Sequence, residues 1–210
     1  PSRRSSSQPF YHEAYSGATL STGCYIPGSS LKGKIRSLLE WRAGAAAAND
    51  GGPIGFKTMH KARDPKEAEK ILKLFGVSGG DEMKPEEAKK IGPTRLAFRD
   101  CQLMPDWVEK TKGKNLPLTE VKMENTIDRV RGVAEHPRNV ERVPAGAKFN
   151  FCLTVKQLGD EDRLLDTVFI GMKLLEMDSL GGSGSRGYGR IKFHLDDAKH
   201  HDQLEKAKPW

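Results

Sequence analysis

The stretch GGSGSRGYGRIKF, residues 181–193, has the glycine spacing of a dinucleotide-binding loop, with Gly182, Gly184 and Gly187 forming a literal G-x-G-x-x-G. Such a loop needs a strand before the glycines and a helix after them, because the pyrophosphate sits on the amides that open the helix. Here the order is reversed: an amphipathic helix ends near Asp178, and YGRIKF predicts a strand. We therefore do not expect dinucleotide binding.

Two interpretations of the glycine-rich stretch stay open from the residues alone. The glycines can serve a helix-to-strand connection that needs positive φ angles. Five glycines in nine residues, with polar side chains between them, nevertheless exceed what a tight turn needs. Bare amides beside an arginine can approach a phosphate closely. The residues predicted to face such a phosphate are Gly182, Ser183, Gly184, Ser185 and Arg186.

Apolar residues at helical spacing predict two long helices. One covers residues 162–178, and its core face is formed by Leu165, Val168, Met172 and Leu175. The other lies in YIPGSSLKGKIRSLLE, residues 25–40, after a turn at Pro27 and Gly28. Ser29 or Ser30 is its predicted N-cap, because a serine hydroxyl accepts from a free amide of the first turn. Its apolar face is formed by Leu31, Ile35, Leu38 and Leu39.

A shorter helix is predicted in DPKEAEKILKLFG, residues 64–76, which begins near Pro65 and ends at Gly76. Its apolar face is formed by Ala68, Ile71, Leu72 and Phe75. Residues 44–64 are rich in Ala and Gly and carry little pattern, so they predict a loop or insertion.

Alternating apolar residues predict the strands. The predicted strands are residues 94–104, 147–158 and 189–195. Residues 118–146 are polar, basic and bounded by prolines, which indicates an extended excursion from the sheet. With one initial strand added, the order of elements is that of a ferredoxin-like β-α-β-β-α-β unit. No initial strand is visible in residues 1–24.

The composition of the 210 residues is that of a globular protein, with 36% hydrophobic and 30% charged residues. No apolar run approaches the roughly 20 residues of a membrane span, and the first residues contain no leader-like apolar segment. We expect a cytoplasmic protein with no membrane partner. The cysteines, Cys24, Cys101 and Cys152, are odd in number and isolated, so we expect buried thiols rather than disulfides.

A net charge of +7 indicates a polyanionic partner, provided that the cations gather in one place. Lys32, Lys34 and Arg36 crowd the start of the first helix, where cations oppose the helix dipole. They are either a solvated basic face or, with Ser29, Ser30 and the free amides, an anion site. The excursion adds Arg129, Arg131, Arg138 and Arg142 and few aromatic residues, so we expect an RNA partner to be held by its backbone.

Three segments in this order, YIPGSSLKGKIRSLLE, ENTIDRVRGVAEHPRNVERV and LEMDSLGGSGSRGYGRIKF, resemble a known family. The chain resembles, over residues 25–195, the RAMP-superfamily backbone subunit, subunit three, of the type III-A CRISPR Csm effector complex. The resemblance implies an α+β, ferredoxin-like (RRM-like) RAMP core with helical and β-hairpin insertions. It implies crRNA and target RNA as partners, together with copies of the subunit stacked in a filament and other Csm-complex subunits.

The resemblance also suggests a domain organisation. Residues 1–24 form an irregular N-terminal arm, and residues 25–210 form a single RAMP domain. Its insertions lie at about 44–93, a helical lid, and at 118–146, a hairpin thumb that kinks the guide–target duplex. The first basic helix and the glycine-rich stretch are placed against crRNA phosphates.

The family cleaves target RNA with an Asp before the I-P-G-S-S motif and a divalent metal, Mg²⁺ or Mn²⁺. Residues 1–28 contain no Asp, and their only carboxylate is Glu13. No catalytic residue is therefore carried over, and we expect the 210-residue chain to bind RNA without cutting it. His12 and Glu13 are interpreted as surface residues.

Two alternatives stay open at this point. The chain could be the related backbone subunit of the type III-B complex, or a standalone RAMP endoribonuclease. The second needs a carboxylate or histidine constellation near the glycines, where only His194 lies close in the sequence.

Overall fold

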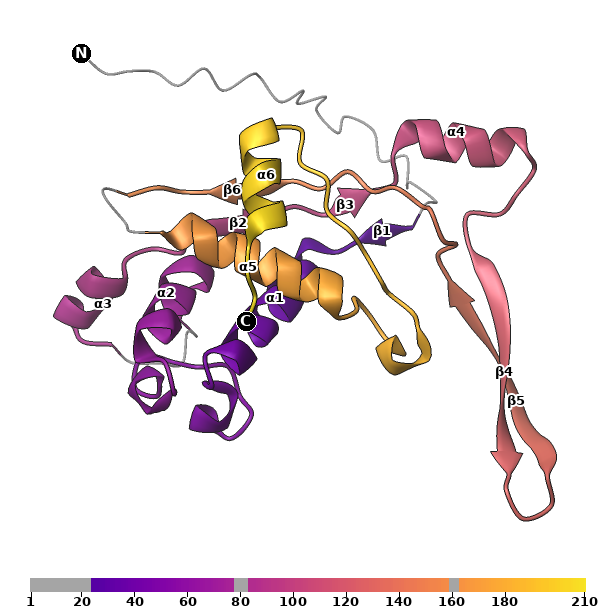
Figure 1. Cartoon of the computed structure of the whole chain (residues 1–210), viewed down its shortest axis with the longest axis horizontal. Coiled ribbons are helices and arrows are strands. Elements are labelled where there is room, and N and C mark those ends of the chain that lie inside the picture. The colour runs from indigo at the N-terminus through magenta and orange to yellow at the C-terminus, as the bar shows by residue number, and fades with distance from the viewer. Residues whose placement is uncertain (1–23, 78–82, 159–162) are drawn as a thin grey trace.

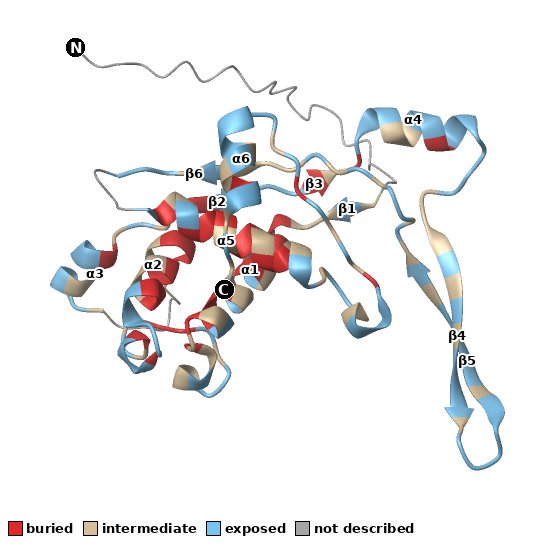
Figure 2. Ribbon diagram, viewed as in Figure 1, coloured by how far each residue is buried: buried red, intermediate tan, exposed pale blue. Residues whose placement is uncertain are grey.

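The computed structural model describes residues 24–77, 83–158 and 163–210. Figure 1 shows helices packed along one side of several short strands, with a long hairpin projecting away from this body. Figure 2 places the buried residues in the helices and the neighbouring strands, whereas the hairpin carries none. The mixed helix and strand content confirms the predicted α+β class.

The two long helices, α1 (Gly28–Arg42) and α5 (Leu164–Met177), pack against each other at the centre of the core. A side chain at Gly171 of α5 would place its Cβ 2.6 Å from Ile35 Cγ2, so this glycine permits the close approach. Both predicted helices are confirmed. Their outer faces differ slightly from the prediction, because Leu38 and Leu165 are only half-buried.

Helix α2 (Pro65–Phe75) packs against both long helices, and the side chains of its predicted apolar face are all buried. Asp64 is the N-cap and accepts a hydrogen bond from the Glu67 amide at 3.0 Å. Gly76 ends the helix with φ of 89°, a backbone conformation that favours glycine. The predicted boundaries of this helix are confirmed.

The start of α1 differs from the prediction, because Pro27 rather than Ser29 or Ser30 is the N-cap. Gly28 lies against the backbone of Phe98 and Arg99, where a Cβ would come within 2.9 Å of carbonyl oxygens. Its amide donates to Asp100 Oδ1 at 2.7 Å. The helix therefore begins one residue earlier than the serines, at a position that only glycine fits.

The strands are shorter than predicted. β2 (Leu96–Phe98) pairs antiparallel with β6 (Leu153–Val155), and β1 (Tyr25–Ile26) pairs antiparallel with β3 (Cys101–Gln102). Further backbone bonds, such as Asn150 N to Gln102 O at 2.8 Å, keep the predicted strand segments side by side between the formal pairs. β1 supplies an initial strand directly after the arm, where the sequence pattern shows none.

The strand predicted at 189–195 is wrong, since these residues form no ladder with any described segment. The side-chain alternation is nevertheless present, because Phe193 is buried between half-buried Ile191 and Leu195. The Phe193 amide donates to Glu176 Oε1 at 2.8 Å instead of to a strand. The ferredoxin-like arrangement of the core stays a prediction.

Several short helices carry too little apolar pattern to be predicted. They are α3 (Pro85–Ile91), α4 (Pro105–Gly113) and α6 (Ala198–Lys206), and each buries a single side chain. Residues 44–64, predicted as a loop, contain two 3₁₀ turns, η1 (Ala46–Asn49) and η2 (Met59–Lys61). This segment buries Ala45, Ile54 and Met59 in the core.

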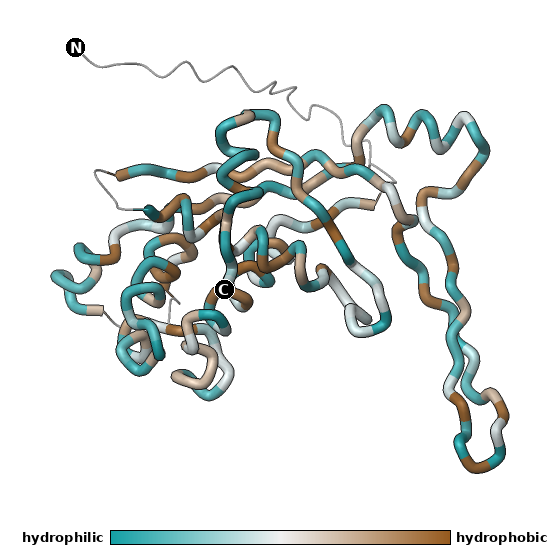
Figure 3. Tube along the Cα trace, viewed as in Figure 1, coloured by the Kyte–Doolittle hydropathy of each residue, from teal (hydrophilic) through white to brown (hydrophobic). Residues whose placement is uncertain are grey.

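The excursion is a two-stranded antiparallel hairpin made of β4 (Glu120–Asp128) and β5 (Val133–Arg142). Its register shifts between Glu124 and Thr126, which marks a bulge. Apolar patches alternate with polar ones along it in Figure 3. Val121, Met123 and Val130 are exposed by 64%, 80% and 96%.

The three cysteines are free thiols: Cys101 is buried, and Cys24 and Cys152 are half-buried. Burial raises the pKa of Cys101. Among the described residues, no helix is long and apolar enough to cross a membrane. The predicted arm, with His12 and Glu13, lies outside the described residues apart from Cys24.

Candidate nucleic-acid interface

The glycine-rich stretch forms a loop that follows α5 in the chain and contacts the hairpin in space. The Leu180 amide bonds to the Gly189 carbonyl at 2.9 Å and closes the loop at its base. Within it, Gly184–Arg186 forms a 3₁₀ turn, η3, that begins after Ser183 with φ of 59°. The loop is thus an ordered element with a short helical turn at its outer end.

The glycines of this loop are of three kinds. Gly181 and Gly187 have φ angles of 87° and 82°, which favour glycine in a turn. A side chain at Gly184 would collide with Ser179, and one at Gly189 would collide with the Leu180 carbonyl. Gly182 has nothing within 4 Å of the position its Cβ would take, and its φ is not in the left-handed region. Of the two interpretations, Gly184 and Gly189 serve the loop itself, whereas Gly182 is open to the outside.

The outer end of the loop is joined to the hairpin through Glu124. The carboxylate accepts from Tyr188 Oη at 2.6 Å, from Arg186 Nη1 at 2.8 Å and from Arg138 Nη2 at 3.1 Å. Tyr188 is only 8% exposed. The hydrogen bond from Tyr188, together with the two guanidinium groups, lowers the pKa of Glu124.

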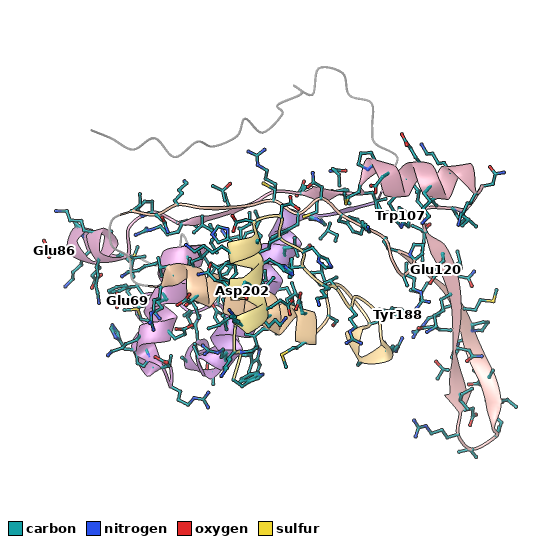
Figure 4. The ribbon with its side chains drawn as sticks, turned by 45° about the horizontal axis from the view of Figure 1, so that its top comes forward. Glu69, Glu86, Trp107, Glu120, Tyr188 and Asp202 are labelled. Carbon is teal, nitrogen blue, oxygen red and sulfur yellow. The ribbon has the colours of Figure 1, made fainter. Side chains whose placement is uncertain are left out.

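Cations of both hairpin strands also contact the ring of Tyr188. Lys122 Nζ of β4 lies 4.7 Å from the ring centroid, and Arg142 Cζ of β5 lies 4.9 Å from it. Figure 4 shows Tyr188, on the glycine-rich loop, near the base of the hairpin at Glu120. A shallow pocket beside this contact is lined by Glu124, Asn125, Thr126, Arg138 and Arg186.

The first helix reaches the loop through one ion pair. Lys34 Nζ lies 2.8 Å from Asp178 Oδ2, at the point where α5 ends and the glycine-rich stretch begins. The hydrogen bond from Lys34 lowers the pKa of Asp178. Lys32 is half-buried and forms no ion pair with a described residue, and Ser29 and Ser30 are exposed. The structure therefore joins α1 to the start of the loop at Lys34 and Asp178.

Arg36 differs from Lys32 and Lys34, because its guanidinium bonds to several groups inside the molecule. Its Nε bonds to Glu40 Oε1 at 2.7 Å, its Nη2 to the Ile54 carbonyl at 2.8 Å and its Nη1 to the Gly76 carbonyl at 3.1 Å. The side chain is 15% exposed. Its guanidinium is used inside the molecule, so we correct its assignment from a phosphate contact to a core contact.

The amides at the start of α1 are also less available than predicted. Asp100 accepts from the Gly28 amide and already places a negative charge at this helix end. A phosphate in this region would be held by Lys32 and the serines more than by the helix dipole.

The remaining predicted cations lie at the far end of the hairpin. Arg131 pairs with Asp128, with Nε 2.6 Å from Oδ2, and with Glu135. The hydrogen bond from the Arg131 amide is the main cause that lowers the pKa of Asp128. Arg129 is exposed and forms no ion pair within the described residues. Of these two, Arg129 is the available charge.

Sequence reasoning missed Glu124 and Tyr188 as a pair. Both lie in the quoted motifs, but nothing in the spacing of residues 64 positions apart indicates that they touch. A tyrosine among small, polar neighbours was the available signal, because a large ring in a bare glycine loop needs a surface to pack on.

The described residues contain no cluster of metal-binding side chains. No three carboxylate, histidine or cysteine side chains gather there as metal ligands would. His194 is exposed and stacks on His201 with ring centroids 5.8 Å apart, away from any such group. The described residues do not fit the divalent ion that the resemblance implies.

Comparisons with known proteins agree on the family. Residues 18–192 match the RAMP superfamily model. A protein of Methanocaldococcus jannaschii named CRISPR system Cms endoribonuclease Csm3 is 45% identical over 80% of this chain and 62% of its own length. One of the same name from Enterococcus italicus is 38% identical over 81% of this chain and 71% of its own length.

The chain thus spans about two thirds of the length of these relatives. Among solved structures, Cmr6 from Pyrococcus furiosus superposes with a TM-score of 0.50 at 15% identity, covering 81% of this chain and 83% of that one, which concerns the fold alone. The family match and the identity to Csm3 proteins place the sequence: this chain belongs to the RAMP superfamily and, within it, to the Csm3 proteins.

Proposed function

We propose that this chain is a crRNA-binding backbone subunit of a type III-A CRISPR effector complex. The observation that carries the proposal is the open backbone at Gly182, with nothing within 4 Å of its missing side chain, in the same ordered loop as Arg186, whose side chain stays 52% exposed while it pairs with Glu124. A phosphate can approach such a backbone closely, and an adjacent guanidinium supplies charge. Relatives at 45% and 38% identity are named as proteins of a CRISPR system.

The RNA-binding surface in this proposal follows the described geometry. It combines the start of α1, through Ser29, Ser30 and Lys32, with the loop residues from Gly182 to Arg186 and with Arg129 on the hairpin. Lys34 contributes by holding the loop to α1 through Asp178. Contacts of this kind go to the sugar-phosphate backbone and carry no sequence information. The surface therefore suits a guide whose sequence varies.

The assembly is part of the same proposal. We propose a ferredoxin-like core with inserted segments at about 44–93 and 118–146, the second being the hairpin. Copies of the subunit stack along the crRNA in the cytoplasm, beside other subunits of the complex, and the hairpin meets the guide–target duplex. The type III-B alternative has less support, because the named relatives are Csm3 proteins.

RNA cleavage is the second candidate function, since the name of the relatives states it for those proteins. Cleavage needs a positioned proton acceptor or metal ligand, with Mg²⁺ or Mn²⁺ as the ion in the family. The described residues offer no group of three such ligands. We propose that RNA binding in this chain is separable from cleavage.

The test of RNA binding uses Lys32 and Arg129, two cations of the proposed surface that form no ion pair with a described residue. Replacing Lys32 or Arg129 with Ala should weaken binding equally for unrelated single-stranded RNA sequences. Each replacement should reduce the slope of log affinity against log salt by about 0.7. The measurement is fluorescence anisotropy titration across a series of salt concentrations.

The matched control is Lys206→Ala, which also removes one positive charge but from α6, where Lys206 pairs with Asp202 at 2.6 Å. Its salt slope should stay that of the wild-type chain. If Lys32→Ala and Arg129→Ala also keep the wild-type slope, neither residue touches the RNA and the proposed surface is wrong.

A further inference from the structure

The hairpin is connected to the rest of the molecule by very few contacts. Figure 1 shows it leaving the body at its base and projecting into solvent. In the described chain, the side chain of Glu141 also bonds to Thr119, directly before β4, and every other hydrogen bond or ion pair that joins a hairpin side chain to another segment ends on Arg186 or Tyr188. The direction of the hairpin therefore depends on the glycine-rich loop.

The contact has the geometry of a clamp. Glu124 of β4 accepts hydrogen bonds from the Tyr188 hydroxyl and the Arg186 guanidinium. Lys122 of β4 and Arg142 of β5 contact the ring of Tyr188. Tyr188 is buried, whereas Gly187 before it is exposed and Gly189 after it is half-buried. Charge-assisted hydrogen bonds of this kind are short and directional.

We propose that Glu124 and Tyr188 are positioning residues, which fix the hairpin relative to the glycine-rich loop so that one RNA chain can contact both. The inference rests on the proposed function. A hairpin that is free to change direction would be oriented for one RNA chain to contact both the hairpin and the loop for only part of the time. The apparent dissociation constant rises by the inverse of that fraction.

If charge alone mattered, replacing Glu124 would have the opposite effect on RNA affinity. Glu124 neutralises Arg138 and Arg186, two cations that line the pocket beside it. If the carboxylate only masked these cations, Glu124→Gln would free them and strengthen RNA binding. If it positions the hairpin, Glu124→Gln weakens RNA binding despite the added net charge. The sign of the change distinguishes the two.

The first measurement needs no RNA. Spin-labelled amino acid analogues are placed at Val130, at the hairpin end, and at Ser37, on the exposed side of α1, so that the native cysteines stay untouched. The inter-label distance distribution should be narrow in the parent chain and broad in Glu124→Gln and Tyr188→Phe. The control, Arg131→Ala, breaks only the ion pairs at the hairpin end and should stay narrow.

The second measurement is the affinity for an unstructured single-stranded RNA long enough to reach the loop and the hairpin end. Glu124→Gln and Tyr188→Phe should each weaken binding about tenfold, as expected when one molecule in ten holds the competent orientation. Thermal unfolding of each variant shows that the core is intact. Tyr188→Phe keeps every charge and the ring, so its effect isolates the hydrogen bond.

Different results would overturn the positioning role of Glu124 and Tyr188 and the proposed RNA-binding function. Narrow distances in Glu124→Gln and Tyr188→Phe, or tighter RNA binding by Glu124→Gln, overturn the positioning role. If the parent chain fails to bind RNA at all, the proposed function fails. The distance distributions then still decide whether Glu124 and Tyr188 orient the hairpin.

Discussion

The guanidinium of Arg36 holds two distant segments of backbone against the first helix. It bonds to the carbonyls of Ile54 and Gly76, and its partner Glu40 accepts from the Ile54 amide at 3.3 Å. Arg36 therefore donates to the Ile54 carbonyl, and Glu40 accepts from the Ile54 amide. Removing one member of such a pair leaves the other charge buried without its partner.

At this residue we expect Arg36→Ala to lower the free energy of unfolding by about 3 kcal/mol, the cost of breaking a buried ion pair from one side. Denaturant unfolding should show the loss as a lower midpoint with an unchanged m-value. Lys32→Ala, on the surface of the same helix, should change stability by no more than about 0.5 kcal/mol. A stable Arg36→Ala chain with weakened RNA binding would return Arg36 to the RNA surface.

The crossing of α1 and α5 makes a prediction at the scale of elements. Gly171→Ala pushes a methyl group into Ile35 and Leu39 and should destabilise the fold by about 1–3 kcal/mol through overpacking. Gly33→Ala, on the exposed side of α1 with nothing within 4 Å, should stabilise it by about 0.5–1 kcal/mol. Thermal unfolding of the two variants should therefore shift in opposite directions. Equal shifts would mean that the helices do not cross at Gly171.

The elements that the sequence predicted correctly are those with a broad apolar face. Helices α1, α2 and α5 each bury several side chains at helical spacing, so local pattern and tertiary packing agree. Helices α3, α4 and α6 bury one side chain each, which leaves no period to detect. Residues 189–195 show the alternation of a strand, but a glutamate side chain takes the place of a neighbouring strand at Phe193.

The candidate interface was predictable as a set of segments and not as a set of contacts. Charge and glycine content in the quoted motifs indicated α1, the loop and the hairpin. The inward turn of Arg36 depends on carbonyls 18 and 40 residues away, and the Tyr188–Glu124 contact spans 64 residues. Contacts between residues this far apart in the sequence form only when the chain folds, so no local sequence pattern predicts them.

For the whole molecule, we expect the 210-residue chain to bind RNA and leave it intact in the presence of Mg²⁺ or Mn²⁺. Losing a positioned acid, base or metal ligand commonly costs a factor of about 10² to 10⁴ in rate. Products are resolved on a denaturing gel with the RNA labelled at one end. Regularly spaced products would contradict the expectation and point to Glu13 or Asp50. Cleavage that appears only when the chain is lengthened toward the size of its relatives would place the missing group outside these residues.

The hairpin described above contains no buried residue among those between 118 and 146. Residues that bury nothing contribute little to the stability of a core, so substitutions along β4 and β5 leave the folded body nearly untouched. Within the part of the chain that the structure describes, the hairpin side chains that contact the body are those that meet Tyr188 and Arg186. Descendants of this sequence can therefore change the outer hairpin without losing the folded scaffold, so selection on this segment acts on its proposed RNA contacts, such as Arg129, and hardly on stability.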